Sequence, residues 1–458
     1  MMRNEVVVFG ASLDPPGIHH EDIVRNLSRA FDKVVVFPCG PARWDKTTVN
    51  DTPLIHRAVM TDLTFGRISR VMVDLSDLEA QKFTPNIEFE KKFGHLGKVW
   101  MAVGADLLVG GASGKSQIQS WEKDDRLWRQ GRFVVLERLG YPLRPEDLPP
   151  YHRVLKISLT GSSTTIREAY RLHSANDKAV TPSVSEYIKR YGLYRSAAPK
   201  STGSLSLTDP QLLIVWERTH ERARLISGQV KHLENRRRPN GILVIGGDGT
   251  MLAAIRKYWR LRLPFIGINT GGTGFLLSDW KRKSINPFFA QTMTIHNMPL
   301  LYVEVDTLDG RTVSGVGFND AWVERASGQT AYVEVSVDGQ VRVPRLKCDS
   351  TLVSTAAGSP AYAQAMGAIP FKFDTQALAL AASCARDFRP KMLPIDSQIT
   401  FRNLDPRKRP LRGMIDSVDQ GIISEMRIRT SKIANAELAF LPGYSFDEKL
   451  LNQQFAKW

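Results

Sequence analysis

The stretch GILVIGGDGTMLAAIRKYW, residues 241–259, places an apolar run before a glycine turn and an amphipathic segment after it. This order predicts a buried strand, a tight turn and a helix, whose free N–H groups at the amino terminus can hold a phosphate. Gly246, Gly247 and Gly249 let the backbone approach such a ligand closely. Asp248 adds a carboxylate that a turn for phosphate alone would not favour. We interpret Asp248 as a candidate general base or metal partner, with helix capping as the alternative.

A second strand and a change of pattern follow along the chain. PFIGINTGGTGFL, residues 264–276, is an apolar run that enters another glycine-rich loop. From about residue 286, segments such as LLYVEVDTLDGRTV alternate apolar and polar residues around Asp-Gly turns, which is typical of antiparallel strands. The sequence therefore predicts an α/β lobe at residues 211–285 and a mainly β-rich lobe at residues 286–458.

The first part of the chain has its own alternating pattern. Runs such as EVVVFG and KVVVFPCG alternate with amphipathic segments such as EDIVRNLSRAF over residues 1–195, which predicts a parallel sheet covered by helices. In such sheets, ligands bind beyond the carboxyl ends of the strands. Residues 196–210, SAAPKSTGSLSLTDP, are mostly small and polar and include proline, so we expect a linker there. The 458-residue chain is thus expected to be α/β, with domains at residues 1–195 and 211–458.

The composition is that of a globular protein, with 42% hydrophobic and 24% charged residues. No apolar run approaches the ~20 residues of a membrane span, so we expect a cytoplasmic protein with no membrane partner. The cysteines, Cys39, Cys348 and Cys384, form no CxxC pair. The spacing supports neither a disulfide framework nor a zinc site, and we interpret all three as buried small hydrophobic residues rather than as catalytic thiols.

The chain carries a net charge of +15, from 62 basic and 47 acidic residues. Apart from the run at residues 236–238, the basic residues are spread out. The sequence contains no helix-turn-helix, zinc-finger or RNA-recognition signature. Phosphorylated small molecules account for the charge, and no nucleic-acid partner is expected.

FGASLDPPGIHHED, residues 9–22, is a candidate phosphate site near the start of the chain. A strand ends there in a glycine turn, and a stiff Asp-Pro-Pro turn precedes a helix. A second surface for a polyphosphate is SLTGSSTTIREAY, residues 158–170, where three hydroxyls precede a helix and an arginine follows one turn later. The residues that carry these two features are Gly10, Ala11, Ser12, Ser162, Ser163, Thr164 and Arg167.

These motifs resemble those of the nicotinate/nicotinamide mononucleotide adenylyltransferases, within the larger nucleotidylyltransferase superfamily. The resemblance covers residues 1–195 and rests on the opening motif, a Gly-Ala-Asp element and a Ser-Ser-Thr-x-x-Arg motif. It implies a Rossmann-like fold and direct transfer of an adenylyl group from ATP to the 5′-phosphate of a mononucleotide, with release of pyrophosphate. The matching residues are Gly10, Ser12, Asp14, Pro15, His20, Gly104, Ala105, Asp106, Ser162, Ser163, Thr164 and Arg167.

The same resemblance implies roles for individual residues. His20 and Arg167 would be catalytic and would stabilise the triphosphate. Mg²⁺ would accompany ATP as the cofactor, with no metal held by protein ligands alone. Asp106 and Trp121 would bind the mononucleotide, with Trp121 stacked on the pyridine ring or, alternatively, packed in the core. The implied ATP-binding residues are Gly10, Ala11, Ser12, His20, Lys46, Ser162, Ser163, Thr164 and Arg167.

Three departures from this pattern fall in the opening motif, and one of them is Leu13, where the family commonly has phenylalanine. Gly17 stands where the family has its first histidine, and His19 stands where it has glycine. His19 is the candidate substitute for the missing donor, but neighbouring residues on a helix point about 100° apart, which argues against this role. If that donor limits activity, a histidine restored at position 17 is expected to raise it. A further segment, GGASGKS at residues 110–116, has Val109 where a P-loop needs glycine, so we interpret it as a flexible loop.

Residues 211–458 resemble the NAD kinases. Besides GGDGT, the chain has NTGGTGFL at residues 269–276, the pair Asn319-Asp320, and CDSTLVSTAAGSPAY at residues 348–362, in the family's order. GGDGT also occurs in diacylglycerol and sphingosine kinases, but the other three motifs favour the NAD kinases. The residues of the last segment that depart from the family's usual ones are Ser350, Ala356, Ala357 and Pro360.

This resemblance implies a two-lobed domain that phosphorylates the 2′-hydroxyl of the adenosine ribose of NAD. Asp248 would accept or orient the hydroxyl proton. Asn319 and Asp320 would bind the adenine and ribose region. Asp349 would lie near the nicotinamide end, and Tyr362 would contact an aromatic ring. The implied NAD-binding residues are Gly247, Asp248, Gly249, Thr250, Asn319, Asp320, Asp349, Thr355, Ala361 and Tyr362.

The leading hypothesis is a bifunctional enzyme whose first domain makes NAD and whose second domain converts NAD to NADP. This order favours nicotinamide over nicotinate mononucleotide, since the product then needs no amidation before the kinase step. The expected partners are ATP, a mononucleotide and NAD, and the kinase domain is expected to form a homo-oligomer. Two alternatives stay open: an active kinase with a binding or regulatory first domain, and a dinucleotide-sensing scaffold with neither activity. The phosphoryl donor, ATP or polyphosphate, also stays open.

Overall fold

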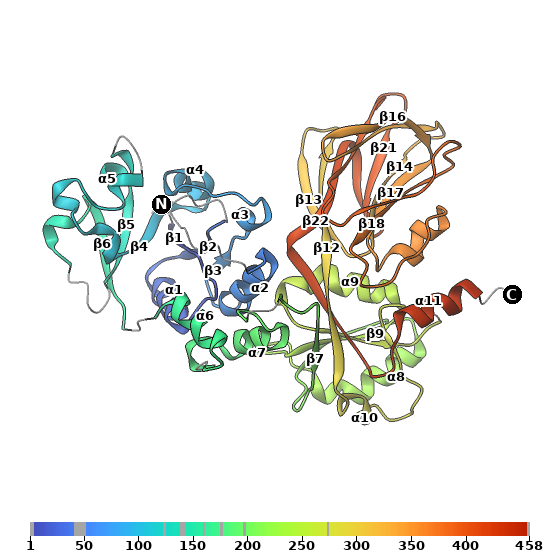
Figure 1. Ribbon diagram of the computed structural model, residues 1–458, viewed down its shortest axis with the longest axis horizontal. Coiled ribbons are helices and arrows are strands. Elements are labelled where there is room, and N and C mark those ends of the chain that lie inside the picture. Colours follow the sequence, from blue (N-terminus) through green and yellow to red (C-terminus); the bar gives the residue numbers. More distant parts are fainter. Residues whose placement is uncertain are drawn as a thin grey trace. The chain divides into compact units, whose positions relative to one another are not determined.

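A computed structural model describes residues 4–40, 52–121, 125–137, 143–158, 161–174, 177–195, 198–272 and 274–455. The chain divides into two compact units, unit 1 (Met1–Lys200) and unit 2 (Ser201–Trp458), which Figure 1 colours along the sequence. The division falls within residues 196–210, where we expected a linker. That expectation is wrong for Thr202–Leu205, which form strand β7, because their backbone pairs with strand β12 (Met293–Thr307).

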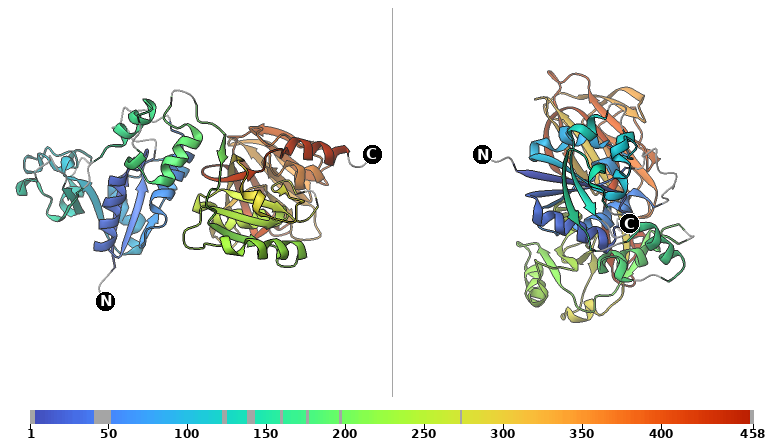
Figure 2. Two further views of the ribbon diagram at one scale, coloured as in Figure 1. Left: turned by 90° about the horizontal axis from the view of Figure 1, so that it is seen from below. Right: turned by 90° about the vertical axis from the view of Figure 1, so that its left-hand side faces the viewer.

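Unit 1 is built on a six-stranded sheet whose neighbouring strands all run parallel. The strand order is β3-β2-β1-β4-β5-β6, so the order reverses between β1 and β4. Sheets of this kind bind ligands at the carboxyl ends of the strands beside that reversal. The predicted parallel sheet is confirmed, and Figure 2 shows its strands in blue and cyan. The strands are β1 (Glu5–Ala11), β2 (Lys33–Pro38), β3 (Val71–Val73), β4 (Lys98–Gly104), β5 (Arg132–Glu137) and β6 (Tyr151–Lys156).

Apolar side chains extend from both faces of this sheet and are buried on each. Val6 and Val8 on β1 are buried in a core that includes Phe89 and Phe93 of α4. Because side chains alternate along a strand, Val7 points to the opposite face, and α1 packs against the neighbouring strand β2. A separate cluster joins α2, α6 and α7. The helices are α1 (Ile18–Ala30), α2 (Leu54–Phe65), α4 (Phe89–Phe93), α6 (Ser163–Arg171) and α7 (Pro182–Tyr191).

In unit 2, a short parallel sheet positions the first glycine turn. Strand β9 pairs in parallel with β8 on one side and with β10 on the other. Alternate residues of β9 face two cores: Ile242 and Val244 pack with helix α9, whereas Leu243 and Ile245 pack with helix α8. Figure 1 shows these two helices on opposite sides of β9. The elements are β8 (Leu212–Trp216), α8 (Glu221–Val230), β9 (Gly241–Gly246), α9 (Asp248–Tyr258) and β10 (Phe265–Asn269).

The antiparallel strands of unit 2 are continuous with this parallel sheet. Strand β22 (Val418–Phe440) pairs antiparallel with β12, and its last residues also pair in parallel with β10. Helix α11 (Phe446–Phe455) then packs into the core around α9. The assignment of residues 286–458 to a β-rich lobe is therefore corrected at its end, because residues 438–455 return to the α/β core. Six of the strands between β12 and β22 are β14 (Asp320–Arg325), β15 (Ala331–Val337), β16 (Gln340–Cys348), β17 (Ser350–Ser354), β18 (Ala377–Ser383) and β20 (Ile399–Asn403).

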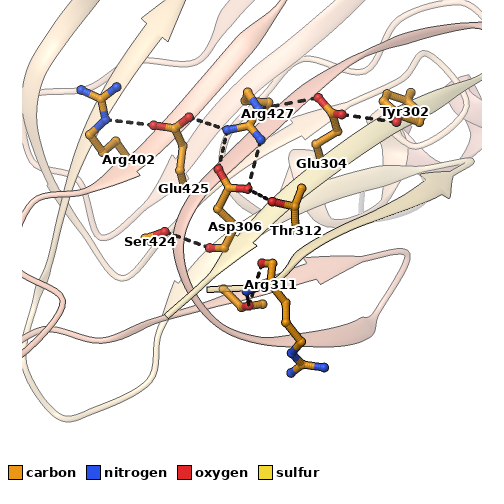
Figure 3. A network of polar contacts seen from close by, with 10 residues as sticks. Tyr302, Glu304, Asp306, Arg311, Thr312, Arg402, Ser424, Glu425 and Arg427 are labelled. Carbon is orange, nitrogen blue, oxygen red and sulfur yellow. Dashed lines mark hydrogen bonds and ion pairs between the residues drawn. The ribbon is translucent and has the colours of Figure 1, made fainter. Parts of the chain in front are cut away.

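Charged side chains of alternating sign cross neighbouring strands of this antiparallel region (Figure 3). Arg427 on β22 lies 2.7 Å from Asp306 Oδ2 on β12 and 2.7 Å from Glu425 Oε1. Arg402 on β20 donates to Glu425 Oε2 at 2.9 Å and lies 3.2 Å from Glu334 Oε1 on β15. Hydrogen bonds from Arg427 lower the pKa of Asp306. This network therefore links four strands through side chains in addition to their backbone ladder.

The structure places the three cysteines in different surroundings. Cys348 is buried and Cys39 is half-buried, whereas Cys384 is exposed. The expectation that all three cysteines are buried is wrong for Cys384, because it follows β18 in a left-handed turn conformation, with φ of 52°. In the part of the chain that the structure describes, no helix combines the length and apolar character needed to cross a bilayer.

Replacing Arg427 with methionine is expected to lower the free energy of unfolding by about 1–2 kcal/mol. The change leaves the carboxylates of Glu304, Asp306 and Glu425 close together without their shared cation. The loss relative to wild type should be full above about pH 4 and should shrink as the pH falls through the lowered pKa of Asp306. Urea unfolding at pH 7 and pH 3 measures both effects. Arg311→Met is the control because Arg311 pairs with Asp309 in solvent, and an equal loss there would contradict the shared-cation argument.

Candidate functional site

Unit 1 contains a cavity of about 880 Å³ beyond the carboxyl ends of β1 and β4. This position matches the reversal of strand order, where ligands of such sheets bind. The structure brings most of the predicted adenylyl-transfer residues to the wall of this one cavity. Lys46 lies outside the described residues. The predicted residues that line the cavity are Gly10, Ala11, Ser12, His20, Asp106, Trp121, Ser162, Ser163, Thr164 and Arg167.

The start of α1 contributes the His20 ring to the wall of the cavity. The Gly17 N–H donates to His20 Nδ1 at 3.0 Å. Because Nδ1 accepts this bond, the proton of the neutral ring is on Nε2, which is then the ring's remaining donor. The sequence places His20 three residues after Gly17, which is the spacing that returns a side chain to the N-cap backbone.

The start of α6 is tied to the same turn. Ser162 caps α6 by accepting from the Thr164 N–H at 3.2 Å, and Ser163 Oγ donates to the Pro15 carbonyl at 2.9 Å. Arg167 donates to the Asp14 carbonyl at 2.5 Å and to Thr164 Oγ1 at 3.2 Å. Two motifs more than 140 residues apart therefore form one basic, hydroxyl-rich wall.

Sequence reasoning missed two residues that hold this turn from behind. Tyr194 donates its hydroxyl to Asp14 Oδ1 at 2.7 Å, and Asp14 is fully buried. Burial raises the pKa of Asp14, although Tyr194 and the charge of Arg57 act in the opposite direction. Arg57 is itself buried and donates to the carbonyls of Ser12 at 2.5 Å and Cys39 at 2.8 Å. An arginine among the apolar residues of the helix at residues 54–65 was the available signal, whereas Tyr194 had none.

The predicted mononucleotide residues, Asp106 and Trp121, also line the cavity. A Cβ at Gly104 would lie 2.3 Å from Asp106 Oδ1, so Gly104 is required for the position of the Asp106 carboxylate. Trp121 lines the cavity and also packs against the core of unit 1, so the structure places it in both of its alternative roles. The segment at residues 110–116 forms a single 3₁₀ turn tied to Asp147, and no α-helix follows it directly. It is therefore a loop and not a P-loop, as the sequence predicts.

In unit 2, the Asp248 carboxylate joins the two glycine-rich loops. Its oxygens accept the N–H groups of Phe275 at 2.9 Å and Leu276 at 2.8 Å. The N-cap of α9 is Gly247, with Asp248 as the first helical residue, so the capping alternative for Asp248 does not hold. Burial raises the pKa of Asp248. Each carboxylate oxygen keeps a second lone pair, which leaves Asp248 able to accept a proton from a ligand.

Gly247 and Gly249, the two glycines that flank Asp248, are not required by the fold. A Cβ at Gly247 or at Gly249 would meet no atom within 4 Å, and neither residue has a left-handed backbone. Their lack of side chains thus leaves open space above the amino terminus of α9, where a ligand's phosphates can approach the backbone. Thr250 points elsewhere, since its hydroxyl donates to Glu217 Oε2 at 2.8 Å.

The C-terminal segment braces the second glycine loop, which sequence reasoning did not predict. Lys449 Nζ on α11 donates to the carbonyls of Gly274 at 2.5 Å and Leu277 at 3.1 Å. It also lies 3.2 Å from Asp279 Oδ2. The Tyr444 hydroxyl donates to the Phe275 carbonyl. Lys449 is 175 residues from Gly274, so no local pattern could have linked the two.

A second cluster of unit 2 surrounds Asn319 and Asp320. The backbone N–H groups of both residues donate to Asp416 Oδ1, at 2.8 and 3.2 Å. Thr355 donates its hydroxyl to the Phe318 carbonyl at 2.8 Å, which gives it a structural contact in place of a free hydroxyl. Within the described chain, the Asn319 Oδ1 atom is buried and accepts no hydrogen bond. This atom is therefore available to a ligand donor, as expected for a binding residue.

The remaining predicted NAD-binding residues lie farther along the sheet. Asp320, the first residue of β14, pairs with Ser354, whereas Asp349 forms an ion pair of 3.2 Å with Arg325 at the end of β14. That length of strand separates Asp349 from Asp320 by roughly 16 Å. Tyr362 packs edge-on against Trp322 of β14, with ring centroids 5.3 Å apart, and Ala361 is exposed. The predicted NAD site of unit 2 is thus distributed over three places: around Asp248, around Asn319, and around Asp349.

The chain is similar in sequence to proteins of one family. The family described as ATP-NAD kinase N-terminal domain matches residues 200–285. An NAD kinase of Rhizorhabdus wittichii is 35% identical over 223 residues, which cover 47% of this chain and 85% of that protein. An NAD kinase of Mesorhizobium japonicum is 31% identical over 219 residues, covering 47% of this chain and 84% of that protein. The crystal structure of yeast NADH kinase complexed with NADH has a TM-score of 0.48 and 15% identity, covering 56% of this chain and 91% of that chain.

Replacing Asp320 with asparagine is expected to raise the free energy of unfolding at pH 8 by on the order of 2–4 kcal/mol and to leave it nearly unchanged at pH 4. Burial, and then the charge of Asp416, raises the pKa of Asp320 to about 7. The folded chain therefore binds this proton more tightly than the unfolded chain, so wild-type stability falls as the pH rises from about 4 to 7. Urea unfolding at pH 4, 6 and 8 measures the difference. Asp349→Asn, at a half-exposed ion pair, is the control, and a pH profile shared by Asp320→Asn and wild type would refute the expectation.

Proposed function

Since the chain belongs to the NAD kinase family, we propose that unit 2 transfers the terminal phosphoryl group of ATP to the adenosine 2′-hydroxyl of NAD, giving NADP. The observation that carries this proposal is the Asp248 carboxylate, which joins both glycine-rich loops and keeps free lone pairs. The open space over Gly247 and Gly249 supports the approach of phosphates to the same place.

The proposed reaction is a direct displacement. The 2′-hydroxyl oxygen attacks the γ-phosphorus of ATP, the bond from that phosphorus to the bridging oxygen breaks, and ADP leaves. The hydroxyl proton passes to Asp248, and the raised pKa of this carboxyl makes it a better proton acceptor near neutral pH. The amino terminus of α9 adds N–H groups and a partial positive charge, which favour the phosphates in the transition state.

Mg²⁺ belongs to this proposal as a partner of ATP rather than of the protein. Over the described residues, no three His, Cys, Asp or Glu side chains gather closely enough to hold a metal ion. Mg²⁺ commonly enters such sites on the oxygens of the substrate's phosphates, with one or two carboxylates and water. When bound in this way, the ion neutralises charge on the phosphate oxygens.

Asp248→Asn is expected to lower kcat for NADP formation by about 10²–10⁴-fold, because an amide cannot take the hydroxyl proton. Formation of NADP from NAD, ATP and Mg²⁺ by the full chain measures the effect. Lys449→Met is the matched control, since it removes the contacts to Gly274 and Leu277 but leaves the carboxylate in place. The control should raise amide hydrogen exchange in the loop and lower kcat far less. An unchanged kcat in Asp248→Asn would exclude the base role.

For unit 1, we propose adenylyl transfer from ATP to nicotinamide or nicotinate mononucleotide, which gives the dinucleotide. The 880 Å³ cavity supports this proposal, because it falls within the ~300–1,000 Å³ usual for small-molecule sites and gathers the predicted residues on its wall. An oxygen of the 5′-phosphate would attack the α-phosphorus of ATP, and pyrophosphate would leave. Arg167 and the Nε2–H of His20 would stabilise the charge that develops on the phosphates.

The full chain incubated with nicotinamide mononucleotide, ATP and Mg²⁺ is expected to form NAD and then NADP. Arg167→Met should lower NAD formation by about 10²-fold, since it removes a positioned cation. The same variant should keep its NADP formation from added NAD, which makes unit 2 an internal control for folding. Parallel assays with the nicotinate mononucleotide compare the two substrates. Kinase activity without any dinucleotide formation would instead favour a binding or regulatory unit 1.

A further inference from the structure

The ring of His19 fills the space that Gly17 leaves empty. A Cβ at Gly17 would lie 2.6 Å from both Cε1 and Nδ1 of the His19 ring. A Cβ at Gly161 would lie 2.4 Å from His19 Nδ1. The imidazole is therefore seated between two glycines, and it is 7% exposed and lines the cavity of unit 1. A side chain at position 17 or at position 161 would displace it.

Helix geometry explains why the ring lies there. Side chains on an α-helix lean toward the amino terminus, so the second residue of α1 leans back over its N-cap. Gly17 is that N-cap and offers no side chain to oppose the ring. The expectation that His19 points about 100° away from the missing histidine is therefore wrong, because it compares Cβ directions and not the place that the ring reaches.

The surroundings of His19 favour an anion. The ring of His20 lies with its centroid 3.9 Å away and at an angle of 39°, and it lines the same cavity. Ser162, Ser163 and Arg167 line this wall as well, and α1 and α6 both begin here. The buried Asp14 carboxyl bonds to Tyr194, and the charges of Arg57 and Arg167 offset its own charge. Two imidazoles, one guanidinium and two helix starts thus face one space.

We propose that His19 is the second imidazole that holds the triphosphate of ATP in unit 1, in the place that Gly17 leaves open. The proposal rests on the adenylyl transfer proposed above. It gives the departures at positions 17 and 19 a single cause, because glycine at position 17 is what allows the ring of residue 19 to reach the wall. On this proposal, the opening motif still supplies two imidazoles, from residues 19 and 20 instead of residues 17 and 20.

A swap of the two residues tests this arrangement in the full chain. His19→Gly should lower NAD formation by on the order of 10²-fold and raise KM for ATP, since it removes one donor. Gly17→His alone should also lower it, because the new Cβ would meet the His19 ring. The double variant Gly17→His/His19→Gly should recover most of the wild-type rate, since the His19 ring is then gone and the new Cβ meets only the flexible end of the Ile166 side chain, at 2.9 Å. NADP formation from added NAD should be unchanged in all three variants.

His19→Phe separates binding from packing. Phenylalanine fills the space between the two glycines but has no N–H donor, so NAD formation should fall while the unfolding temperature stays close to that of wild type. Wild-type activity in His19→Phe or in His19→Gly would overturn the proposal. So would a double variant no more active than either single one.

A calorimetric titration with inorganic tripolyphosphate separates this proposal from the proposed function. The titration of His19→Phe should show one tripolyphosphate-binding site fewer than the titration of wild type. If wild type forms no NAD but this site is lost in His19→Phe, adenylyl transfer fails and the anion-binding role of His19 stands. If wild type forms NAD and the titrations of wild type and His19→Phe are the same, the role of His19 fails and adenylyl transfer stands.

Discussion

The antiparallel pairing of β12 with β22 is the constraint on which unit 2 depends. It runs from Thr294↔Phe440 to Thr307↔Ile423, and so passes from the β-rich region to the parallel sheet. Both ends of β22 hold a part of the candidate site. Asp416, just before it, accepts the N–H groups around Asn319, and Lys449, after it, holds the second glycine loop. The strand β22 thereby fixes the position of the cluster around Asn319 relative to the cluster around Asp248, although no residue of β22 belongs to either cluster.

Two carboxylates, Asp248 and Asp416, hold turns of unit 2. Asp248 accepts two backbone N–H groups and Asp416 accepts three, which offsets part of the cost of removing each charge from water. Burial still raises the pKa of both. In unit 2 the same physical fact serves two purposes, because a carboxyl that braces a loop and has a raised pKa is also suited to take a proton.

In unit 1, glycine and histidine stand at positions 17 and 19 in the reverse of the motif's order, and the ring of His19 still lies beside Gly17 at the wall of the cavity. A sequence motif specifies the residue type at each position of the chain, whereas a ligand contacts side-chain atoms, which can lie some distance from their own Cα. The ring of His19 reaches the space beside Gly17 because helix side chains lean toward the amino terminus and because Gly161 also lacks a side chain. The wall around this ring is built from α1 and α6, whose motifs lie far apart in the chain.

The sequence by itself determined the strands, the glycine turns and the residues at the helix starts, because these follow from local periodicity and from backbone freedom over a few residues. It therefore identified Asp248, His20 and Arg167, each next to such a turn. Only the tertiary structure decided the partners of these residues. Arg57, Tyr194, Asp416 and Lys449 act across 45 to 180 residues of chain, and no local pattern records such contacts. It also decided the separation of Asp349 from Asp320, since the length of a strand pair, and not motif order, sets how far apart two motifs lie.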